Sequence, residues 1–498
     1  MSLRKILVAN RGEIALRIVR ACHELGIQAV AVYSDADRLA PHVLAADEAY
    51  RIGKAPSAAS YLRADVLIEV ALAAGCDAVH PGYGFLAERG HFAAAVTAAG
   101  LTFVGPPAAA IEAMGDKTAA RRRMIAAGVP IVPGTSEPAA DAASALAAAR
   151  DIGFPVLLKA AAGGGGKGMR VVESEDELER AFAAASREAL AAFGDGSVYL
   201  ERYLDGPRHI EIQVLADAHG HTVHLGEREC SIQRRHQKMI EEAPSGVLTP
   251  EQRRAMGEAA VAAAAAVGYV NAGTIEFLWQ NGEFFFLEMN TRLQVEHPVT
   301  ELVTGVDIVA WQIRIAGGAA LDFDQDDVRI EGHAIECRIT SEDPDNGFVP
   351  STGRIDRVDV PAGPGVRWDA GIVEGSEVSL YYDPMLAKLI TTGPDRATAI
   401  ARMERALHEL RVVGVETSAA FHRRVMREDD YRAGRIDIRY LDRHPELLAP
   451  ARDAELEQSL ALAAALLEEE RRQHRRVRRV AEPASGGTRS AWRPGGWR

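Results

Sequence analysis

Glu276 and Glu288 stand in two apolar, aromatic-rich runs that flank an Asn-Gly pair at 281–282. Such a pair between two apolar runs predicts a β-hairpin. A carboxylate buried among large apolar side chains is too costly to keep charged without a partner. Two of them, with the amide of Asn290 two residues further on, indicate a site where oxygen atoms bind a hard divalent cation such as Mg²⁺. The alternative is a hairpin whose two glutamates form salt bridges.

The register of this hairpin decides whether the two carboxylates can act together. Glu276 and Glu288 lie directly opposite only if the loop has three residues, 281–283. A two-residue loop would pair Glu276 with Leu287 and turn Glu288 to the other face. We therefore expect a three-residue loop that forms a bulge, with Gly282 at positive φ.

The segment after the hairpin adds polar groups at every second position. Arg292, Gln294 and Glu296 alternate, and in an extended chain they would project to one side. A cation, an amide and a carboxylate beside a metal site could bind an anion and move a proton.

A glycine-rich segment, 163–168, separates a strand expected at 154–160 from another at 169–172. Glycine loses the most entropy on ordering, so packing does not explain this sequence. Backbone N–H groups in such a flap can wrap around phosphate, and the strand before it ends in Lys159. The segment is not a Walker A loop, because GxxxxGK[ST] is absent and a strand follows. A flexible linker is the alternative.

The run 231–238 is dense in positive charge. Like charges this close repel each other unless an anion is near, which favours an anion site over a solvated loop. In an extended chain His236 and Lys238 would face the same side. Alternate side chains of the run 209–214, starting with His209, also share one face.

The N-terminal residues alternate short strands and helices, with a strand at 5–9, a helix at 14–25 and a strand at 27–33. This alternation is typical of an open parallel sheet, and the first turn lacks GxGxxG. His-Pro-Gly-Tyr-Gly-Phe at 80–85 follows a further strand, where loops line the ligand crevice of such sheets. Tyr83 could offer a ring face or a hydroxyl group there. A plain tight turn is the alternative.

Composition bounds the class of protein. The chain has 498 residues, 26% of them charged and 47% hydrophobic, and a net charge of −13. We expect about three domains and no nucleic-acid partner. Four scattered cysteines without a CxxC pair fit a reducing cytoplasm. The apolar run at the N-terminus is too short for a signal peptide, and no stretch reaches the roughly 20 apolar residues of a membrane span.

The C-terminal third is expected to form a separate β-rich unit beyond Arg338, with Gly-Pro punctuation between short strands and a helix at 396–412. A second helix is expected at 455–480, where the acidic residues 468–470 precede several arginines. This segment is interpreted as a solvated or disordered basic tail, and docking to another protein of the same complex is the alternative.

These motifs, in this order, resemble the ATP-grasp superfamily and, within it, biotin carboxylase. The resemblance runs from about residue 6 to about 444 and rests on the flap after Lys159, the Glu201 segment, the run 288–301, the motif at 80–85 and Ile-Glu-Cys-Arg-Ile at 335–339. It implies an α/β and α+β fold in three domains. These are an N-terminal open parallel sheet domain (1–114), an ATP-grasp domain (115–334) with a mobile glycine-rich lid at about 131–204, and a β-rich C-terminal domain (335–447). The basic tail is 448–498.

The resemblance also implies roles for individual residues. Glu276, Glu288 and Asn290 would hold two Mg²⁺ or Mn²⁺ ions. Bicarbonate would be bound by Lys238, Arg292, Gln294, the Val295 backbone and Glu296, with Glu296 as the base. Biotin would contact Arg338 and Tyr83, with His209 as a weaker candidate, and the catalytic set would be Glu296, Lys238, Arg292 and Arg338. Adenine would meet the backbone of Tyr203 and Leu204, and the full ATP-binding set would be Lys117, Lys159, Gly163, Gly164, Gly165, Gly166, Gly168, Glu201, Tyr203, Leu204, His209, Gln233, His236, Leu278, Glu276 and Glu288.

The implied reaction is ATP-dependent carboxylation of biotin with bicarbonate through carboxyphosphate. No Met-Lys dipeptide occurs, so the Ala-Met-Lys-Met biotin-attachment motif is missing and biotin is expected on a separate carrier protein. The implied partners are that carrier, carboxyltransferase subunits and a second copy of the chain. The expected setting is acetyl-CoA carboxylase in cytoplasmic fatty acid synthesis. Arg202 departs from the family pattern, in which many relatives carry lysine.

Other interpretations remain open. The chain could serve a carboxylase for propionyl-CoA, another acyl-CoA or pyruvate. It could also be an ATP-grasp ligase for another acid or a carbamoyl-phosphate-type enzyme, although neither needs Tyr83 and Arg338 beside Glu296. A non-catalytic ATP-binding subunit would bind ATP without turnover.

Overall fold

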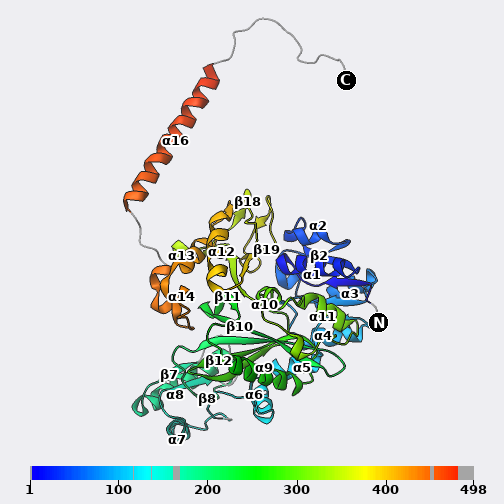
Figure 1. The fold of residues 1–498 in the computed structure, drawn as a ribbon, viewed down its shortest axis with the longest axis vertical. Helices are drawn as coiled ribbons and strands as arrows, with labels where there is room; N and C mark the ends of the chain where they lie inside the picture. The colour runs from blue at the N-terminus through cyan, green and yellow to red at the C-terminus, as the bar shows by residue number, and fades with distance from the viewer. Residues whose placement is uncertain (1–2, 116, 136, 161–168, 449–453, 481–498) are drawn as a thin grey trace. The chain divides into compact units, whose positions relative to one another are not determined.

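The computed structural model describes residues 3–115, 117–135, 137–160, 169–448 and 454–480. The chain divides into two compact units, Met1–Leu448 and Ala449–Arg498. The first unit combines a parallel sheet, antiparallel sheets and the helices that cover them (Figure 1). The expected fold class is therefore confirmed.

The N-terminal sheet has five parallel strands in the order β3-β2-β1-β4-β5. Its central strands are apolar and buried on both faces, as a parallel sheet covered by helices requires. The loops after β1 and β4 leave from the same edge of the sheet, the usual place of a ligand crevice. The strands are β1 (Lys5–Val8), β2 (Gln28–Ser34), β3 (Glu48–Gly53), β4 (Ala78–His80) and β5 (Thr102–Phe103), joined by helices α1 (Gly12–Glu24), α2 (Pro41–Ala45), α3 (Ala64–Ala73) and α4 (Gly90–Ala98).

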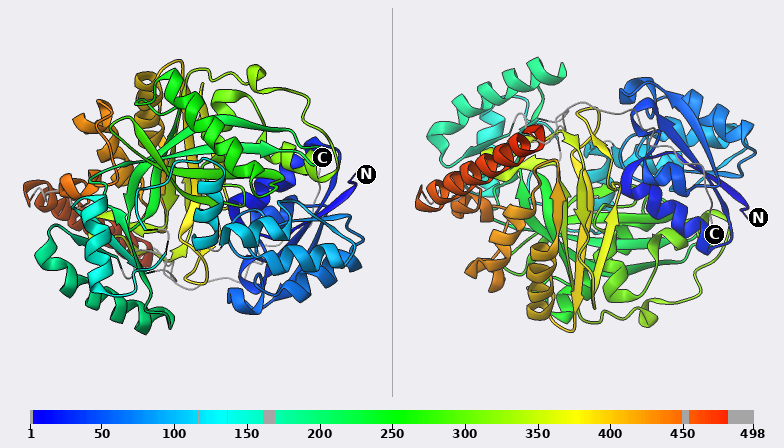
Figure 2. Two further views of the ribbon diagram at one scale, coloured as in Figure 1. Left: turned by 90° about the horizontal axis from the view of Figure 1, so that it is seen from below. Right: turned by 90° about the horizontal axis from the view of Figure 1, so that it is seen from above.

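A second, antiparallel sheet of eight strands carries most of the candidate site (Figure 2, green to yellow). Its order is β13-β12-β9-β10-β11-β14-β21-β19. The β-rich C-terminal part continues this sheet, because β14, which contains Arg338, pairs directly with β11. The strands are β9 (Arg208–Ala216), β10 (Thr222–Arg234), β11 (Gln237–Ala243), β12 (Asn271–Gln280), β13 (Glu283–Asn290), β14 (His333–Thr340), β19 (Val366–Ala370) and β21 (Met385–Gly393).

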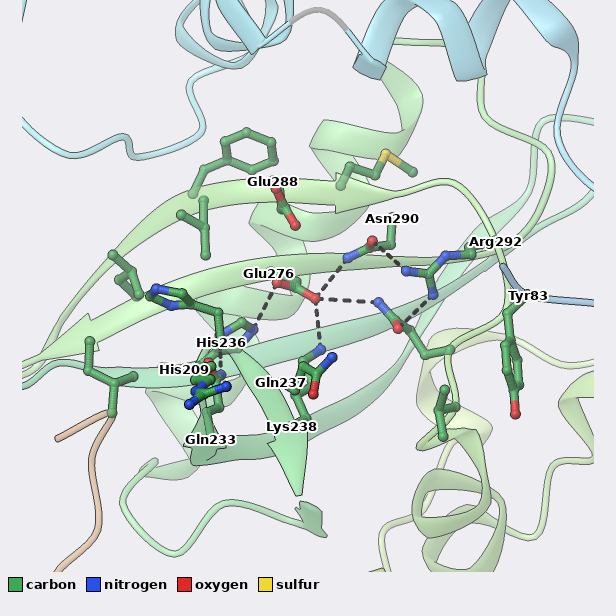
Figure 3. A pocket seen from close by; sticks show the side chains of 18 of the residues that line it. Tyr83, His209, Gln233, His236, Gln237, Lys238, Glu276, Glu288, Asn290 and Arg292 are labelled. Atoms are coloured by element: carbon green, nitrogen blue, oxygen red, sulfur yellow. Dashed lines mark hydrogen bonds and ion pairs between the residues drawn. The ribbon is translucent and has the colours of Figure 1, made fainter. Parts of the chain in front are cut away.

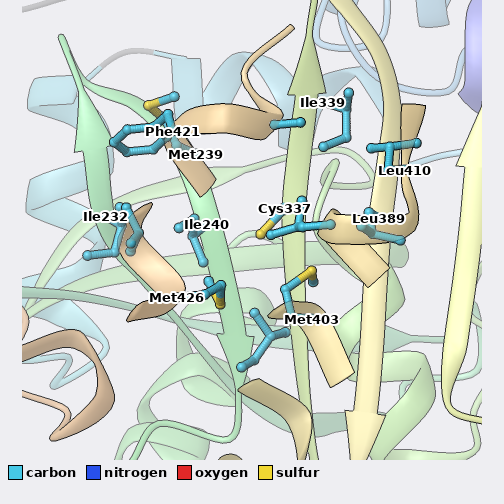
Figure 4. Packing of buried hydrophobic residues seen from close by; sticks show 14 of the residues in the cluster. Ile232, Met239, Ile240, Cys337, Ile339, Leu389, Met403, Leu410, Phe421 and Met426 are labelled. Atoms are coloured by element: carbon cyan, nitrogen blue, oxygen red, sulfur yellow. The ribbon is translucent and has the colours of Figure 1, made fainter. Parts of the chain in front are cut away.

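One hydrophobic core crosses the expected boundary near residue 335. Ile240 on β11 and Cys337 on β14 pack with Leu389 on β21 (Figure 4). Met403 of α12 (Arg396–Glu409) and Phe421 of α13 (Ala419–Arg427) cover the same cluster. The C-terminal strands and helices thus support the face of the sheet opposite the site. The expected helix 396–412 ends at Glu409, because β22 (Arg411–Val413) follows.

The expected lid contains a three-stranded sheet in the order β7-β6-β8. It has a small core of its own, formed with helices α7 and α8. Residues 161–168, which include the glycine-rich flap, lie outside the described residues. The elements are α7 (Ala142–Ile152), β6 (Val156–Ala160), β7 (Arg170–Val172), α8 (Glu175–Phe193) and β8 (Val198–Arg202).

Other helices complete the first unit. Helix α9 begins at a capping box between Thr249 and Gln252, with Pro250 at its first position, which is a strong start signal. The helices are α5 (Ala108–Gly115), α6 (Lys117–Ala126), α9 (Pro250–Ala265), α10 (His297–Thr304), α11 (Ile308–Ala316), α14 (Asp429–Arg432) and α15 (Tyr440–Arg443), and the short strands are β15 (Glu342–Asp343), β16 (Val349–Pro350), β17 (Gly353–Arg354), β18 (Arg357–Asp359) and β20 (Glu377–Val378).

The second unit contains helix α16 (Ala454–Val480), in agreement with the helix expected at 455–480. Four of its leucines, at 460, 462, 466 and 467, are exposed. Among the described residues, no helix is long and apolar enough to cross a membrane.

Candidate active site

A cavity of about 1060 Å³ lies between the large sheet, the lid sheet and the loop that follows β4. Most of the predicted site residues line it, and Figure 3 shows several of them pointing into one space. Leu204 is buried and packs against Leu278, and Glu296 lies beneath the cavity surface. The lining residues that were predicted are Tyr83, Lys159, Glu201, His209, Gln233, His236, Lys238, Glu276, Leu278, Glu288, Asn290, Arg292, Gln294, Val295 and Arg338.

Some predicted nucleotide contacts cannot be followed to their side chains. Gly163, Gly164, Gly165, Gly166 and Gly168 lie outside the described residues. Lys117 begins helix α6, and its side chain is also outside the described part. The backbone N–H of Tyr203 already donates to the Pro155 carbonyl (3.1 Å), so a contact to adenine at Tyr203 would use its carbonyl oxygen.

The hairpin of β12 and β13 places Glu276 opposite Glu288, as expected. The expected three-residue loop is wrong, because pairing begins directly on either side of a two-residue tip at 281–282. Both tip residues have positive φ, which suits a tight Asn-Gly turn. The register shifts further down, beside Glu276, where Leu287 is the extra residue of a bulge. The bulge, rather than the loop, returns Glu288 to the face of Glu276.

Lys238 is the central cation of the sheet side of the cavity. Its Nζ donates to Glu211 Oε2 (2.5 Å), Glu276 Oε1 (2.8 Å) and Glu296 Oε1 (2.7 Å). Burial alone would lower the pKa of Lys238, but the three carboxylates raise it well above its usual value. The amine therefore stays charged and holds three buried carboxylates together.

Lys238 reaches this place through a hairpin, not the extended segment that we expected. Strands β10 and β11 pair with Gln233 opposite Lys238. The tip consists of Arg235 and His236, which both have positive φ although neither is glycine. His236 is exposed at this tip and lines the cavity. Turn signals usually include Gly or Asn, so the residue types gave no sign of this turn.

Glu296 is fully buried between two cations. Its Oε1 accepts from Lys238, and its Oε2 accepts from Arg338 Nη2 (2.9 Å). Burial would raise the pKa of Glu296, but Lys238, Arg338 and Arg228 hold it well below the usual value, so the carboxylate is ionised. The expected extended run is not formed here, because Glu296 sits in the turn that begins helix α10.

Arg292 is oriented by groups from two parts of the chain. It donates to Gln294 Oε1 (2.8 Å) and to Asn290 Oδ1 (3.1 Å). It also donates to Glu88 Oε2 (2.9 Å), which comes from the N-terminal part. Sequence reasoning missed Glu88, whose only signal is its place three residues after the motif at 80–85.

Three further buried groups were missed or given no role. Arg228 donates to Glu211 Oε1 (2.5 Å) on the side away from Lys238. Glu241 accepts from Arg338 Nε (2.6 Å), and burial raises the pKa of Glu241 to about 7. Glu336 lies opposite Glu241 across the strand pair, and burial raises the pKa of Glu336 well above its usual value. The available signal for Glu336 was an acidic residue between two apolar ones, Ile335 and Cys337.

The lid side of the cavity has a different charge arrangement. Glu201 on β8 accepts from Arg121 Nη1 of helix α6 (2.8 Å) and from Lys159 Nζ on β6. Two cations therefore share one carboxylate at the wall where ATP was expected. Arg121 belongs to an Arg-Arg-Arg run that carried no predicted role.

The donor set fits a divalent metal ion. Glu276 accepts from Asn290 Nδ2 (2.8 Å), and its Oε2 lies 2.9 Å from His209 Nε2. Burial would raise the pKa of Glu276, but Lys238 and His209 lower it, so its carboxylate is ionised. Figure 3 shows Glu288 directed toward Glu276 from the neighbouring strand. Carboxylate and amide oxygens are the ligands that Mg²⁺ and Mn²⁺ prefer.

The fold and this site define an enzyme of the ATP-grasp type, and comparisons with known proteins agree. Family models match residues 2–111 (biotin carboxylase, N-terminal domain), 116–323 (carbamoyl-phosphate synthase L chain, ATP binding domain) and 336–443 (biotin carboxylase C-terminal domain). The chain belongs to the biotin carboxylase family. The expected enzyme class, an ATP-dependent ligase of the biotin carboxylase type, is confirmed by these matches.

Two curated relatives show the degree of similarity. One of the pyruvate carboxylase subunits of Methanothermobacter thermautotrophicus is 54% identical over 440 residues, which cover 88% of this chain and 90% of the relative. Biotin carboxylase of Haemophilus influenzae is 52% identical over 442 residues, which cover 89% of this chain and 98% of the relative. A solved structure, the biotin carboxylase domain dimer of Hydrogenobacter thermophilus 2-oxoglutarate carboxylase with MgADP, ADP and bicarbonate, has a TM-score of 0.84. It is 50% identical and covers 91% of this chain and 100% of its own.

Proposed function

We propose that this chain carboxylates the biotin of a separate carrier protein, with bicarbonate and ATP, through carboxyphosphate. The observation that carries the proposal is the placement of Glu296. An ionised, fully buried carboxylate sits between Lys238 and Arg338, at the edge of a cavity that also contains the opposed Glu276 and Glu288. A base beside two cations and a metal site is suited to deprotonating a small anion and transferring a phosphoryl group to it.

The two walls of the cavity would hold the two ends of the nucleotide. On the lid side, ATP would be held by Lys159, Glu201, the flap 163–168 and Lys117. The other ATP contacts would be His209, Gln233, His236, Leu278 and the backbone of Tyr203 and Leu204. Glu276, Glu288 and Asn290 would hold two Mg²⁺ or Mn²⁺ ions. When bound, the ions neutralise phosphate charge during transfer.

Lys238, Arg292, Gln294 and the Val295 backbone would bind bicarbonate next to Glu296. The carboxylate then takes the bicarbonate proton, and the freed oxygen attacks the γ-phosphorus while ADP leaves. Lys238 now holds the pKa of Glu296 down. Bound bicarbonate would interact with Lys238, and bound biotin with Arg338, so both cations would stabilise the Glu296 carboxylate less. The pKa of Glu296 would therefore rise, and it would be a stronger base, when both substrates are present.

The second half of the reaction uses Arg338 and Tyr83. Carboxyphosphate breaks down to CO₂ and phosphate, and the phosphate takes the ureido proton of biotin. Arg338 would stabilise the enolate, and the deprotonated nitrogen would attack CO₂ to form a C–N bond. Tyr83 lines the same cavity and would contact the biotin ring.

The particular carboxylase system follows from the relatives as a proposal. We assign the chain to an acetyl-CoA carboxylase of fatty acid synthesis, with a carrier protein and carboxyltransferase subunits as partners. Four similar relatives named biotin carboxylase, at 51–52% identity, support this assignment. The homodimer is supported by the neighbour described as a dimer. A role in pyruvate carboxylase is the second candidate, which the 54% identical relative favours.

The test is fixation of radiolabelled bicarbonate. The purified chain is incubated with MgATP, labelled bicarbonate and free biotin, and acid-labile carboxybiotin is measured. The proposal expects labelled product that requires ATP and is lost in Glu296→Gln, a variant of nearly the same shape. Product formed equally by Glu296→Gln would exclude Glu296 as the base. For the acceptor, addition of carrier and carboxyltransferase subunits with acetyl-CoA or pyruvate should yield product with acetyl-CoA.

A further inference from the structure

Behind the Glu296 carboxylate lies a second buried charge pair that plays no part in the mechanism above. Lys388 on β21 has no exposed surface, and its Nζ lies 3.2 Å from Glu13 Oε1. Glu13 stands in the first turn of helix α1, so the pair joins the C-terminal strands to the N-terminal part. A buried lysine needs strong acceptors, and their identity indicates its role.

The second acceptor of Lys388 is the backbone carbonyl of Val295, at 2.8 Å. Val295 directly precedes Glu296. Because a peptide unit is planar, fixing this carbonyl also fixes the direction of the Glu296 N–H. His297 Nδ1 lies 2.8 Å from the Gln294 carbonyl, so the two consecutive carbonyls before helix α10 are both held by side chains. The backbone that carries Glu296 is thereby clamped.

Glu13 extends the clamp to the biotin side of the cavity. The hydroxyl group of Tyr83 donates to the same Oε1 of Glu13 that faces Lys388. Asn10 Nδ2 donates to the Tyr83 carbonyl (2.7 Å), so both the backbone and the ring of Tyr83 are fixed. A Cβ at Gly371, just after β19, would come within 2.7 Å of the Glu13 nitrogen, which shows how closely these parts pack.

We propose that Lys388 and Glu13 are positioning residues that set the Val295–Glu296 peptide and Tyr83 in one rigid frame. Lys388 also lies opposite Arg338 in the sheet register, so the strand that carries Lys388 pairs with the strand that carries a third group of the site. The inference rests on the proposed function of Glu296 and Tyr83. Neither Lys388 nor Glu13 lines the cavity, so they act through other residues.

The test compares Lys388→Met with Arg396→Met. The change Arg396→Met also removes the cation of a buried ion pair, here with Glu242 (2.6 Å). Arg396 itself contacts neither the cavity nor any group in the frame. For Lys388→Met we expect kcat of bicarbonate-dependent ATP cleavage to fall about 10- to 100-fold, because a displacement of about 1 Å costs that much, with KM for ATP within about twofold. Arg396→Met should keep kcat within about threefold while its Tm falls.

Two further variants keep the proposal testable if Lys388→Met folds poorly. Glu13→Gln keeps the shape and an acceptor oxygen for Lys388 and Tyr83, and should lower kcat about three- to tenfold. Tyr83→Phe removes the hydroxyl donor. If the frame links the Val295–Glu296 peptide with Tyr83, the double variant Lys388→Met/Tyr83→Phe should carboxylate biotin no more slowly than Lys388→Met alone, within about twofold.

The outcomes separate this inference from the proposed function. If the wild-type protein shows no bicarbonate-dependent ATP cleavage, both the proposed function and the positioning role are overturned. Active wild-type protein with Lys388→Met and Arg396→Met equal in kcat would leave the function and overturn the positioning role. Fully multiplicative effects of Lys388→Met and Tyr83→Phe would overturn the link between the two sides.

Discussion

The two walls of the cavity balance charge in opposite ways. On the lid wall, Arg121 and Lys159 share the single carboxylate of Glu201. On the sheet wall, Lys238 is shared by Glu211, Glu276 and Glu296, and Glu288 stands opposite Glu276. Arg228, His209 and Arg338 contact the other oxygens of these three carboxylates. The first wall places two cations at one carboxylate, which suits phosphate, whereas the second places Glu276 and Glu288 opposite each other, which suits metal ions. A metal–nucleotide complex carries negative phosphates and positive metal ions. The lid wall therefore suits the phosphates, and the sheet wall suits the metal ions.

The largest effect is expected when the cation that three carboxylates of the sheet wall share is removed. Lys238→Met leaves three buried carboxylates without their shared partner, and such a loss costs about 3–5 kcal/mol of unfolding free energy. Lys159→Met should cost only about 1–2 kcal/mol, because Glu201 keeps Arg121. Urea-induced unfolding of both variants measures the difference. Equal losses in the two variants would break the comparison of the walls.

Metal dependence should be confined to the sheet wall. Glu276→Gln should raise the Mg²⁺ concentration for half-maximal ATP cleavage about 10- to 100-fold, because a charged ligand is lost. Glu201→Gln, the matched change on the lid wall, should raise KM for ATP and leave the Mg²⁺ requirement within about twofold. Kinetic titration with Mg²⁺ at fixed ATP distinguishes the two. Chelation of Mg²⁺ should stop wild-type turnover but leave Tm unchanged, since Lys238 and His209 already neutralise Glu276.

Two buried histidines should give opposite pH dependence of stability. Burial lowers the pKa of His422, behind the sheet, from 6.5 to about 4. Its unfolded form therefore binds more protons, and stability is lost as the pH falls from 6.5 toward 4, by about 3 kcal/mol in full. His209 is also buried, but Glu276 raises its pKa above 6.5, so its contribution is lost as the pH rises through that higher value.

Unfolding free energies of His422→Gln and His209→Gln, measured from about pH 5 to 8, check these signs. The His422 variant should flatten the acid side of the profile, and the His209 variant should flatten the alkaline side. The assignment of partners would be refuted if both variants changed the same side.

The smallest effect is expected at Arg202, where many relatives are expected to carry lysine. Arg202 lies 3.2 Å from Glu283 on the partly exposed rim of the lid wall. Exposed pairs of this kind contribute about 0–1 kcal/mol, so Arg202→Lys should leave unfolding free energy within about 0.5 kcal/mol. Steady-state kinetics should change less than about twofold. A tenfold rise in KM for ATP would place Arg202 in the nucleotide site instead.

Residue types and spacing were sufficient to predict most of the elements, whereas much of the predicted cavity lining followed from the resemblance to biotin carboxylase. The parallel N-terminal sheet was predicted correctly from its local alternation of strands and helices. The opposition of Glu276 and Glu288 was also predicted, but from a three-residue loop that does not form. The bulge at Leu287 was not predictable, since an extra residue in one strand leaves no distinctive sequence. The turn at Arg235 and His236 was missed because it contains neither Gly nor Asn, the usual residues of such turns.

Long-range partners were the other limit. Glu88 reaches Arg292 and Glu13 reaches Lys388 only after the N-terminal sheet has packed against the large sheet. Glu241 and Glu336 become neighbours through the pairing of β11 with β14, which joins parts that we expected to be separate. Spacing within one segment carries no information about such pairs.

The most direct test of the proposed reaction is ATP hydrolysis by the purified chain with Mg²⁺ and bicarbonate, with and without free biotin, beside Glu296→Ala. We predict turnover that depends on bicarbonate, rises when biotin is added and falls about 10²- to 10⁴-fold in the variant, the usual range for loss of a general base. ATP binding without biotin-responsive turnover, or full activity in Glu296→Ala, would be incompatible with carboxylation at this site.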